Sequence, residues 1–151
     1  MATRVYLGDL RYTTAGILAN DCMPLGVAYM KAVMDRDNPD VTSRLFAYPD
    51  ALLTALAEAP PDVLMLSNYV WNEALSREFF RIAKKLNPGI LTVMGGPNIP
   101  LEAERQIAYL EAHPEIDVYI TGEGDFAASR LVQAWDDAGR SHKVFGARGF
   151  E

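Results

Sequence analysis

Short β-like runs alternate with helix-length segments along the chain, and this alternation is the feature that most limits its possible folds. We expect strands over 4–9, 41–48, 62–67, 90–96 and 117–121. We expect helices over 24–37, 50–59, 72–87, 100–112 and 124–138. Alternation with short connections and apolar strand centres is typical of a parallel sheet covered by helices on both faces. The sequence therefore predicts an α/β fold, a three-layer doubly wound five-stranded parallel sheet with the flavodoxin-like (Rossmann-like) order 2-1-3-4-5.

Composition and charge narrow the class of protein further. The 151 residues suffice for one domain, half of them are hydrophobic, and the net charge is −6. Scattered Lys and Arg residues disfavour nucleic acid as a partner. The apolar runs are too short to cross a membrane, and the N-terminus lacks the pattern of a signal peptide, so we expect a cytoplasmic protein without a membrane partner. Cys22 is the single cysteine, which excludes an internal disulfide or a cysteine cluster for zinc or iron–sulfur.

The carboxyl edge of such a sheet is where a ligand is expected to bind. The connectors that reach this edge are 9–23, 48–49, 67–72, 95–99 and 121–124. The first of these is unusually long, and long loops in compact domains are commonly functional.

The connector after the third strand carries unusual residues for a turn. It contains Asn68, Tyr69, Trp71 and Asn72, whereas a turn needs only small or polar residues. The neighbouring connectors bring "MGGPNIP" and "TGEGD", whose glycines permit close approach of another group. Ser67 offers a hydroxyl beside them. The edge is therefore predicted to hold a flat ligand, although each glycine could also serve the backbone alone.

Several familiar chemistries do not match this edge. No GxGxxG or GxxxxGK[ST] motif follows a strand, which disfavours a dinucleotide or nucleoside triphosphate. The acids and lysine of a phosphate receiver are incomplete, since Asp9 stands alone after the first strand. His113 and His142 are expected at the opposite edge, so a catalytic triad has no histidine here.

The segments "PLGVAYMKAVM", "DVLMLSNYVWN", "VMGGPNIP" and "DVYITGEGD", in this order, resemble the N-terminal cobalamin-binding domain of cobalamin-dependent radical SAM proteins. The resemblance covers nearly the whole chain. It implies that cobalamin lies over the carboxyl edge of the sheet, with its dimethylbenzimidazole tail entering beside the third and fourth strand loops.

The resemblance also implies roles for particular residues. Ser67 would hydrogen-bond the tail. The residues expected around the tail are Gly95, Gly96, Pro97, Gly122, Glu123 and Gly124. The residues expected at the corrin or its amides are Asn68, Tyr69, Val70, Trp71 and Asn72. The alternative is that the two aromatic residues are ordinary core and that Asn72 only caps a helix.

The sequence departs from related families at two motifs. Related methyltransferases and mutases carry DxHxxG in the first loop, with the histidine on cobalt, whereas this chain has Tyr12 at the histidine position. Tyr12 is accordingly expected among the residues that contact the cofactor. We therefore expect base-off binding with no histidine below the metal, and no protein ligand to a metal. The CxxxCxxC motif of the radical SAM half is also missing from this sequence.

We accordingly expect residues 1–138 to form a cobalamin-binding Rossmann-like domain that is not catalytic alone. Residues 139–151 would begin a linker to a C-terminal radical SAM domain, which would carry a 4Fe-4S cluster and bind S-adenosylmethionine. The parent protein would then be a methyltransferase or a related enzyme. Two alternatives stay open, a ligand-free regulatory or interaction domain of flavodoxin-like fold and a small flavin-binding domain.

Overall fold

The computed structural model describes residues 2–19 and 21–142. It contains one parallel sheet of five strands in the order β4-β1-β5-β6-β7. The strands are β1 (Thr3–Gly8), β4 (Val41–Phe46), β5 (Val63–Ser67), β6 (Leu91–Gly95) and β7 (Val118–Ile120). Counted along the chain, this is the order 2-1-3-4-5, so the predicted topology is confirmed.

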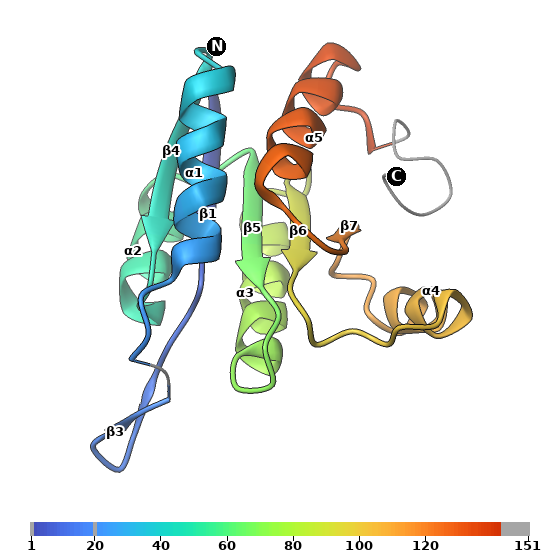
Figure 1. Cartoon of the computed structure of the whole chain (residues 1–151). Coiled ribbons are helices and arrows are strands. Elements are labelled where there is room, and N and C mark those ends of the chain that lie inside the picture. Colours follow the sequence, from blue (N-terminus) through green and yellow to red (C-terminus); the bar gives the residue numbers. More distant parts are fainter. Residues whose placement is uncertain (1, 20, 143–151) are drawn as a thin grey trace.

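Five helices connect the strands and cover both faces of the sheet (Figure 1). They are α1 (Leu25–Asp37), α2 (Pro49–Glu58), α3 (Glu73–Leu86), α4 (Ala103–Ala112) and α5 (Asp125–Asp137). Helices α1 and α5 lie together on one face, while α2 and α3 lie on the other. The predicted three-layer arrangement is therefore confirmed.

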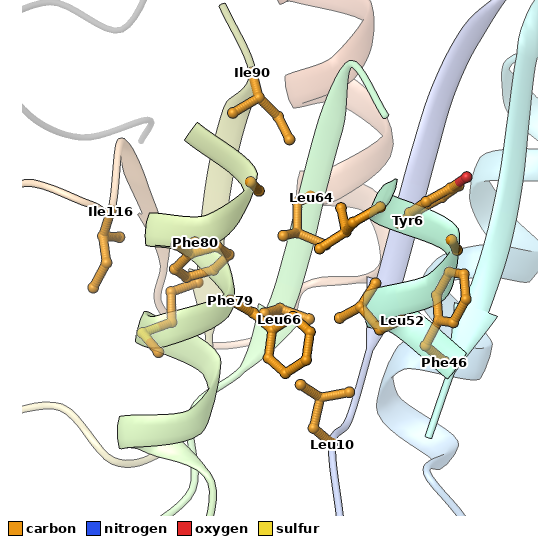
Figure 2. Packing of buried hydrophobic residues seen from close by; sticks show 14 of the residues in the cluster. Tyr6, Leu10, Phe46, Leu52, Leu64, Leu66, Phe79, Phe80, Ile90 and Ile116 are labelled. Carbon is orange, nitrogen blue, oxygen red and sulfur yellow. The ribbon is translucent and has the colours of Figure 1, made fainter. Parts of the chain in front are cut away.

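Each face of the sheet has its own apolar core. On the α1 and α5 face, Met34 and Trp135 pack against strand residues such as Val63 and Val93. On the opposite face, Leu64 of β5 packs among side chains of α2 and α3, including Phe80 (Figure 2). Because β5 is covered on both faces, all five of its residues are buried, as expected of the central strand of a parallel sheet.

The first connector contains a small hairpin that sequence patterns did not predict. Strand β2 (Thr13–Thr14) pairs antiparallel with β3 (Ile17–Leu18). The two turn residues Ala15 and Gly16 have φ of 51° and 79°, the positive values that a tight two-residue hairpin requires. Alanine seldom occupies such a position, so the sequence carried little signal for this turn.

The other element boundaries agree with expectation to within a few residues, and α4 shows the largest difference. This helix begins at Ala103, whereas the sequence suggested residue 100. Glu102, just before the helix, has an extended backbone with φ of −79° and ψ of 129°, and Asn98 is bonded through its backbone N–H to the carbonyl of Asn68. The start of the helix is therefore delayed by a connector that is tied to the neighbouring loop.

The proposed C-terminal linker is described only in part. Of the proposed linker 139–151, residues 143–151 lie outside the described part of the chain. Within residues 2–19 and 21–142, none of the helices combines the length and the apolar character needed to cross a bilayer.

Replacing Leu64 by alanine tests the central core. Leu64 has no exposed surface, so removing three carbons should leave a cavity and lower the free energy of unfolding by about 2–5 kcal/mol. Urea denaturation followed by circular dichroism measures this change. The control Leu101→Ala removes the same atoms from a side chain that is 92% exposed, and it should change stability by less than about 0.5 kcal/mol. Equal losses in the two variants would contradict the assigned core.

Candidate functional site

The carboxyl ends of three neighbouring strands lie at one level. In the sheet register, Ser67 at the end of β5 pairs with Gly95 at the end of β6, and Gly95 pairs with Ile120 at the end of β7. Residues that are far apart in sequence therefore form one continuous edge. The structure thus places Ser67 beside Gly95, the first residue of the glycine pair.

A cavity of about 160 Å³ opens at this edge, between the strand ends and the first turns of α1 and α5. Most of its wall is apolar or is bare backbone. The predicted residues that line it are Ser67, Tyr69, Gly95, Gly96, Gly122 and Gly124. A cavity of about 150 Å³ with apolar walls holds one benzene-sized ring, so this cavity suits a single flat aromatic group.

A second cavity of about 260 Å³ adjoins the first one. Both cavities are lined by Gly26, Val27, Ser67 and Tyr69, so they share a wall. The second cavity is also lined by Trp71, by Asp9 and by residues 22–25 of the first connector. The first cavity forms an apolar slot, and the wall that it shares with the second cavity joins it to this larger and more polar space.

The aromatic pair of the turn after β5 stacks face to face. The rings of Tyr69 and Trp71 have centroids 4.5 Å apart and an interplanar angle of 4°. Trp71 remains 37% exposed and Val70 between them is 84% exposed. The pair is therefore not ordinary core, and it offers a flat apolar surface beside the second cavity.

The two asparagines of the same turn point into the protein, and neither side chain has exposed surface. The Asn68 amide nitrogen donates to the carbonyl of Asn98 at 2.7 Å and to the Tyr119 hydroxyl at 3.0 Å. The Asn72 amide oxygen accepts from the backbone N–H of Tyr69 at 2.9 Å. These side chains shape the turn, and neither lines a cavity.

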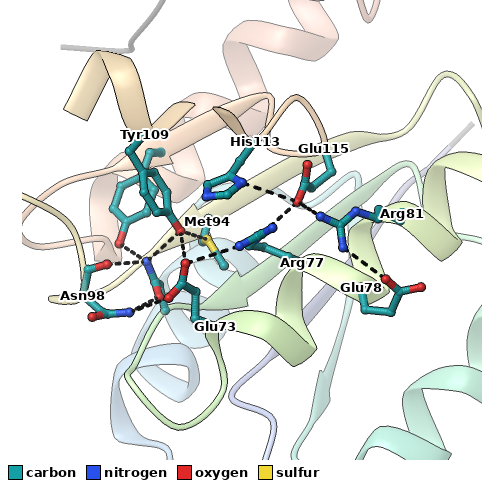
Figure 3. Close-up of polar contacts among 11 residues, drawn as sticks. Glu73, Arg77, Glu78, Arg81, Met94, Asn98, Tyr109, His113 and Glu115 are labelled. Carbon is teal, nitrogen blue, oxygen red and sulfur yellow. Dashed lines mark hydrogen bonds and ion pairs between the residues drawn. The ribbon is translucent and has the colours of Figure 1, made fainter. Parts of the chain in front are cut away.

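A polar network continues from Asn68 across the α3 and α4 side of the sheet (Figure 3). Glu73 accepts hydrogen bonds from the Tyr109 hydroxyl at 2.9 Å and from the amide of Asn98 at 3.1 Å. Burial, together with the hydrogen bond to Glu73, raises the pKa of Tyr109 above its usual range. Burial raises the pKa of Tyr119 to about 12. Both phenols therefore stay neutral hydrogen-bond donors at physiological pH. Tyr109 joins α4 to the start of α3 through Glu73, and Tyr119 of β7 donates to the carbonyl of Gly96 at 2.8 Å.

Gly96 is required by the close approach of two connectors. Its φ is 132°, and a Cβ atom there would lie 2.5 Å from the carbonyl oxygen of Asn68. In contrast, a Cβ at Gly95 would meet the carbonyl oxygen of Ile120 at 3.3 Å, and one at Gly124 would meet the sulfur of Met30 at 3.3 Å. Gly96 thus allows the two loops to pack closely, and Gly95 leaves the cavity wall without a side chain.

The remaining predicted residues lie around the cavities rather than in them. Glu123 and Pro97 are exposed. Tyr12 is 40% exposed beside the hairpin, where its carbonyl accepts from the backbone N–H of Ala19. Among the described residues, no group of three or more His, Cys, Asp or Glu side chains could hold a metal ion. His142 contacts the carbonyl of Ile90, before β6 and so at the opposite edge of the sheet.

Sequence patterns missed the contribution of α1 and α5. Gly26, Val27 and Met30 of α1 and Asp125 of α5 line the first cavity. These residues sit in the first turns of helices that follow β1 and β7, and parallel topology brings such turns to the carboxyl edge. The topology alone could therefore have suggested them, whereas their residue types gave no signal.

The fold and this edge define a Rossmann-like domain with an apolar cavity at the carboxyl ends of its strands. The model of the B12 binding domain family matches residues 14–132. The chain therefore belongs to the B12-binding domain family. This agrees with the resemblance identified from its motifs, and cobalamin is the cofactor that this family binds.

Two characterised relatives share this region. The chain is 32% identical over 122 residues to 2-(S-pantetheinyl)-carbapenam-3-carboxylate methyltransferase of Streptantibioticus cattleyicolor, which covers 78% of this chain and 18% of the relative. It is 31% identical over 115 residues to the cobalamin-dependent radical SAM methyltransferase TokK of Streptomyces tokunonensis, covering 73% of this chain and 16% of the relative. The chain thus spans less than a fifth of the length of these relatives.

Replacing Gly96 by alanine tests the loop contact. The new methyl group would collide with the backbone of Asn68 and strain a positive φ, so the free energy of unfolding should fall by at least about 2 kcal/mol. Gly26→Ala is the control, because a Cβ there meets nothing within 4 Å and alanine favours a helix by about 0.5–1 kcal/mol. Thermal unfolding of both variants measures the difference. A Gly96→Ala protein as stable as Gly26→Ala would show that the two connectors do not touch.

Proposed function

We propose that this chain binds cobalamin base-off, with the dimethylbenzimidazole tail in the first cavity and the corrin over the second. The observation that carries the proposal is the apolar slot between Gly26 of α1 and the strand ends Ser67 and Gly95. Its volume and glycine-lined wall suit one flat heterocycle. Cobalamin, once bound, supplies a cobalt centre that can accept and donate a methyl group.

The residues of the chain divide into those that hold the tail and those that meet the corrin. Ser67, Gly95, Gly96, Gly122 and Gly124 lie where the tail would pass. Pro97 and Glu123 would shape the outer ends of the same connectors.

Tyr69, Val70 and Trp71 would face the corrin, since the stacked pair is flat and its neighbouring valine is open to solvent. Asn68 and Asn72 would act by fixing this turn, because both amides are engaged within the protein. Tyr12, beside the hairpin, would border the corrin from the first connector.

We propose no histidine ligand below cobalt. Tyr12 occupies the position where DxHxxG domains place histidine, and His142 lies at the opposite edge of the sheet. The tail would be detached from cobalt by insertion into the cavity, without imidazole taking its place.

In its full context the domain would serve a cobalamin-dependent radical SAM methyltransferase. One relative is named as such an enzyme, and both are methyltransferases much longer than this chain. The 4Fe-4S cluster and S-adenosylmethionine would then bind a separate domain joined after residue 138, in keeping with the single cysteine of this chain.

A visible-absorption titration of the purified protein with hydroxocobalamin tests the cofactor and its mode of binding. The wild-type protein should give a saturable shift to a base-off spectrum. Gly26→Trp should weaken binding by at least about tenfold, or about 1.4 kcal/mol, because an indole from α1 would fill the slot. Tyr29→Trp is the matched control, since Tyr29 is 60% exposed on the same helix and lines neither cavity.

Other outcomes would identify other functions. Saturable binding of flavin in place of cobalamin would favour a flavin domain. Binding of neither cofactor would favour a ligand-free interaction domain. Equal affinities of Gly26→Trp and Tyr29→Trp for cobalamin would show that the tail does not occupy this cavity.

A further inference from the structure

Three buried polar side chains form a cluster around Ser67, which belongs to the wall that the two cavities share. The Ser67 hydroxyl donates to Asp9 Oδ1 at 2.7 Å. The Asn72 amide nitrogen donates to the same Asp9 oxygen at 3.0 Å and to Ser67 Oγ at 2.8 Å. Each of the three side chains is at least nine-tenths buried, and Ser67 reaches both cavities.

The hydrogen positions in this cluster follow from the chemistry of its members. An ionised carboxylate can only accept, so the single hydroxyl hydrogen of Ser67 points to Asp9. The Asn72 amide nitrogen can only donate, and it faces three acceptors, namely Asp9, Ser67 and the carbonyl of Leu10. Ser67 therefore presents lone-pair density to the cavity and no hydrogen. A ligand can bond to it there only as a donor.

The cluster is also negatively charged. Asp9 accepts from two neutral donors, Ser67 and Asn72, and no Lys, Arg or His within residues 2–19 and 21–142 forms an ion pair with it. A buried charge of this kind favours a nearby positive partner, because the interior screens the attraction weakly. Reversing the Ser67 hydroxyl toward the cavity would instead break a charge-assisted hydrogen bond, the stronger kind.

We propose that the Asp9–Ser67–Asn72 cluster selects the protonated form of an aromatic nitrogen base in the first cavity. The ring N–H donates to Ser67 Oγ, and the carboxylate of Asp9 balances the charge. The step is one proton transfer from water to the ring nitrogen, with no oxidation or reduction. This assignment rests on the proposed function, in which the base is the dimethylbenzimidazole tail of cobalamin, and it makes Asp9 a positioning residue for that tail.

Other titratable groups also face the two cavities. Asp125 of α5 and Tyr69 of the turn line the first cavity, and Cys22 of the first connector lines the second. Asp125 is the one further carboxylate among these lining residues, and no hydrogen bond joins it to Ser67. Asp50 of α2 is exposed and lines neither cavity, so it provides a control for a general effect of negative charge.

Isothermal titration calorimetry with methylcobalamin, in buffers of different ionisation enthalpy at about pH 7, tests the assignment by counting protons. The upper methyl group of this cobalamin does not titrate. The wild-type protein should take up about one proton for each cobalamin bound. Asp9→Asn should still bind methylcobalamin, with proton uptake near zero, since an amide can keep both hydrogen bonds without the charge. Asp50→Asn should take up as many protons as the wild type.

Each result has a distinct meaning. Base-off binding by the wild-type protein without proton uptake would overturn the assignment and leave the proposed function intact. Loss of uptake in Asp50→Asn, with uptake preserved in Asp9→Asn, would also overturn it. Failure of the wild type to bind methylcobalamin at all would overturn the proposed function, and this assignment with it.

Discussion

The buried amide of Asn68 is the interaction on which the shape of the carboxyl edge depends. It bonds to Asn98 in the next connector and to the hydroxyl of Tyr119 on β7, so one side chain joins the turns after β5 and β6 to the neighbouring strand. Gly96 allows the two backbones to come this close. A buried amide without its hydrogen-bond partners would destabilise the fold by about 1–3 kcal/mol. The width of the cavity beside it is thereby fixed before any ligand arrives.

At this edge, residues that are adjacent in sequence have two different roles. Asn68 and Asn72 face inward and hold the turn, whereas Val70 and Trp71 between them face outward. Ser67, immediately before the turn, belongs to the cavity wall. A cofactor that inserts one ring into the slot would thus meet a preorganised surface, and little ordering of the chain would oppose its binding.

The fold was predictable because its signals are local, and the site was predictable only in part. Apolar strand centres and periodic helices such as α3 require only neighbouring residues to be compared, and the strand order follows from general rules of connection. The inward direction of Asn72, the contact of Gly96 with Asn68 and the pairing of Asp9 with Ser67 depend on residues tens of positions apart. The hairpin at Ala15 was missed because alanine is an uncommon residue at a positive φ.

The central claim is that the nucleotide tail of cobalamin occupies the slot between α1 and the ends of β5, β6 and β7. A crystal structure of the protein with bound cobalamin tests it most directly. The account predicts the dimethylbenzimidazole ring between Gly26 and Gly95, with its nitrogen at Ser67 Oγ and the corrin beside Trp71. Cobalamin bound with its tail still on cobalt, or seated away from this edge, would contradict the account.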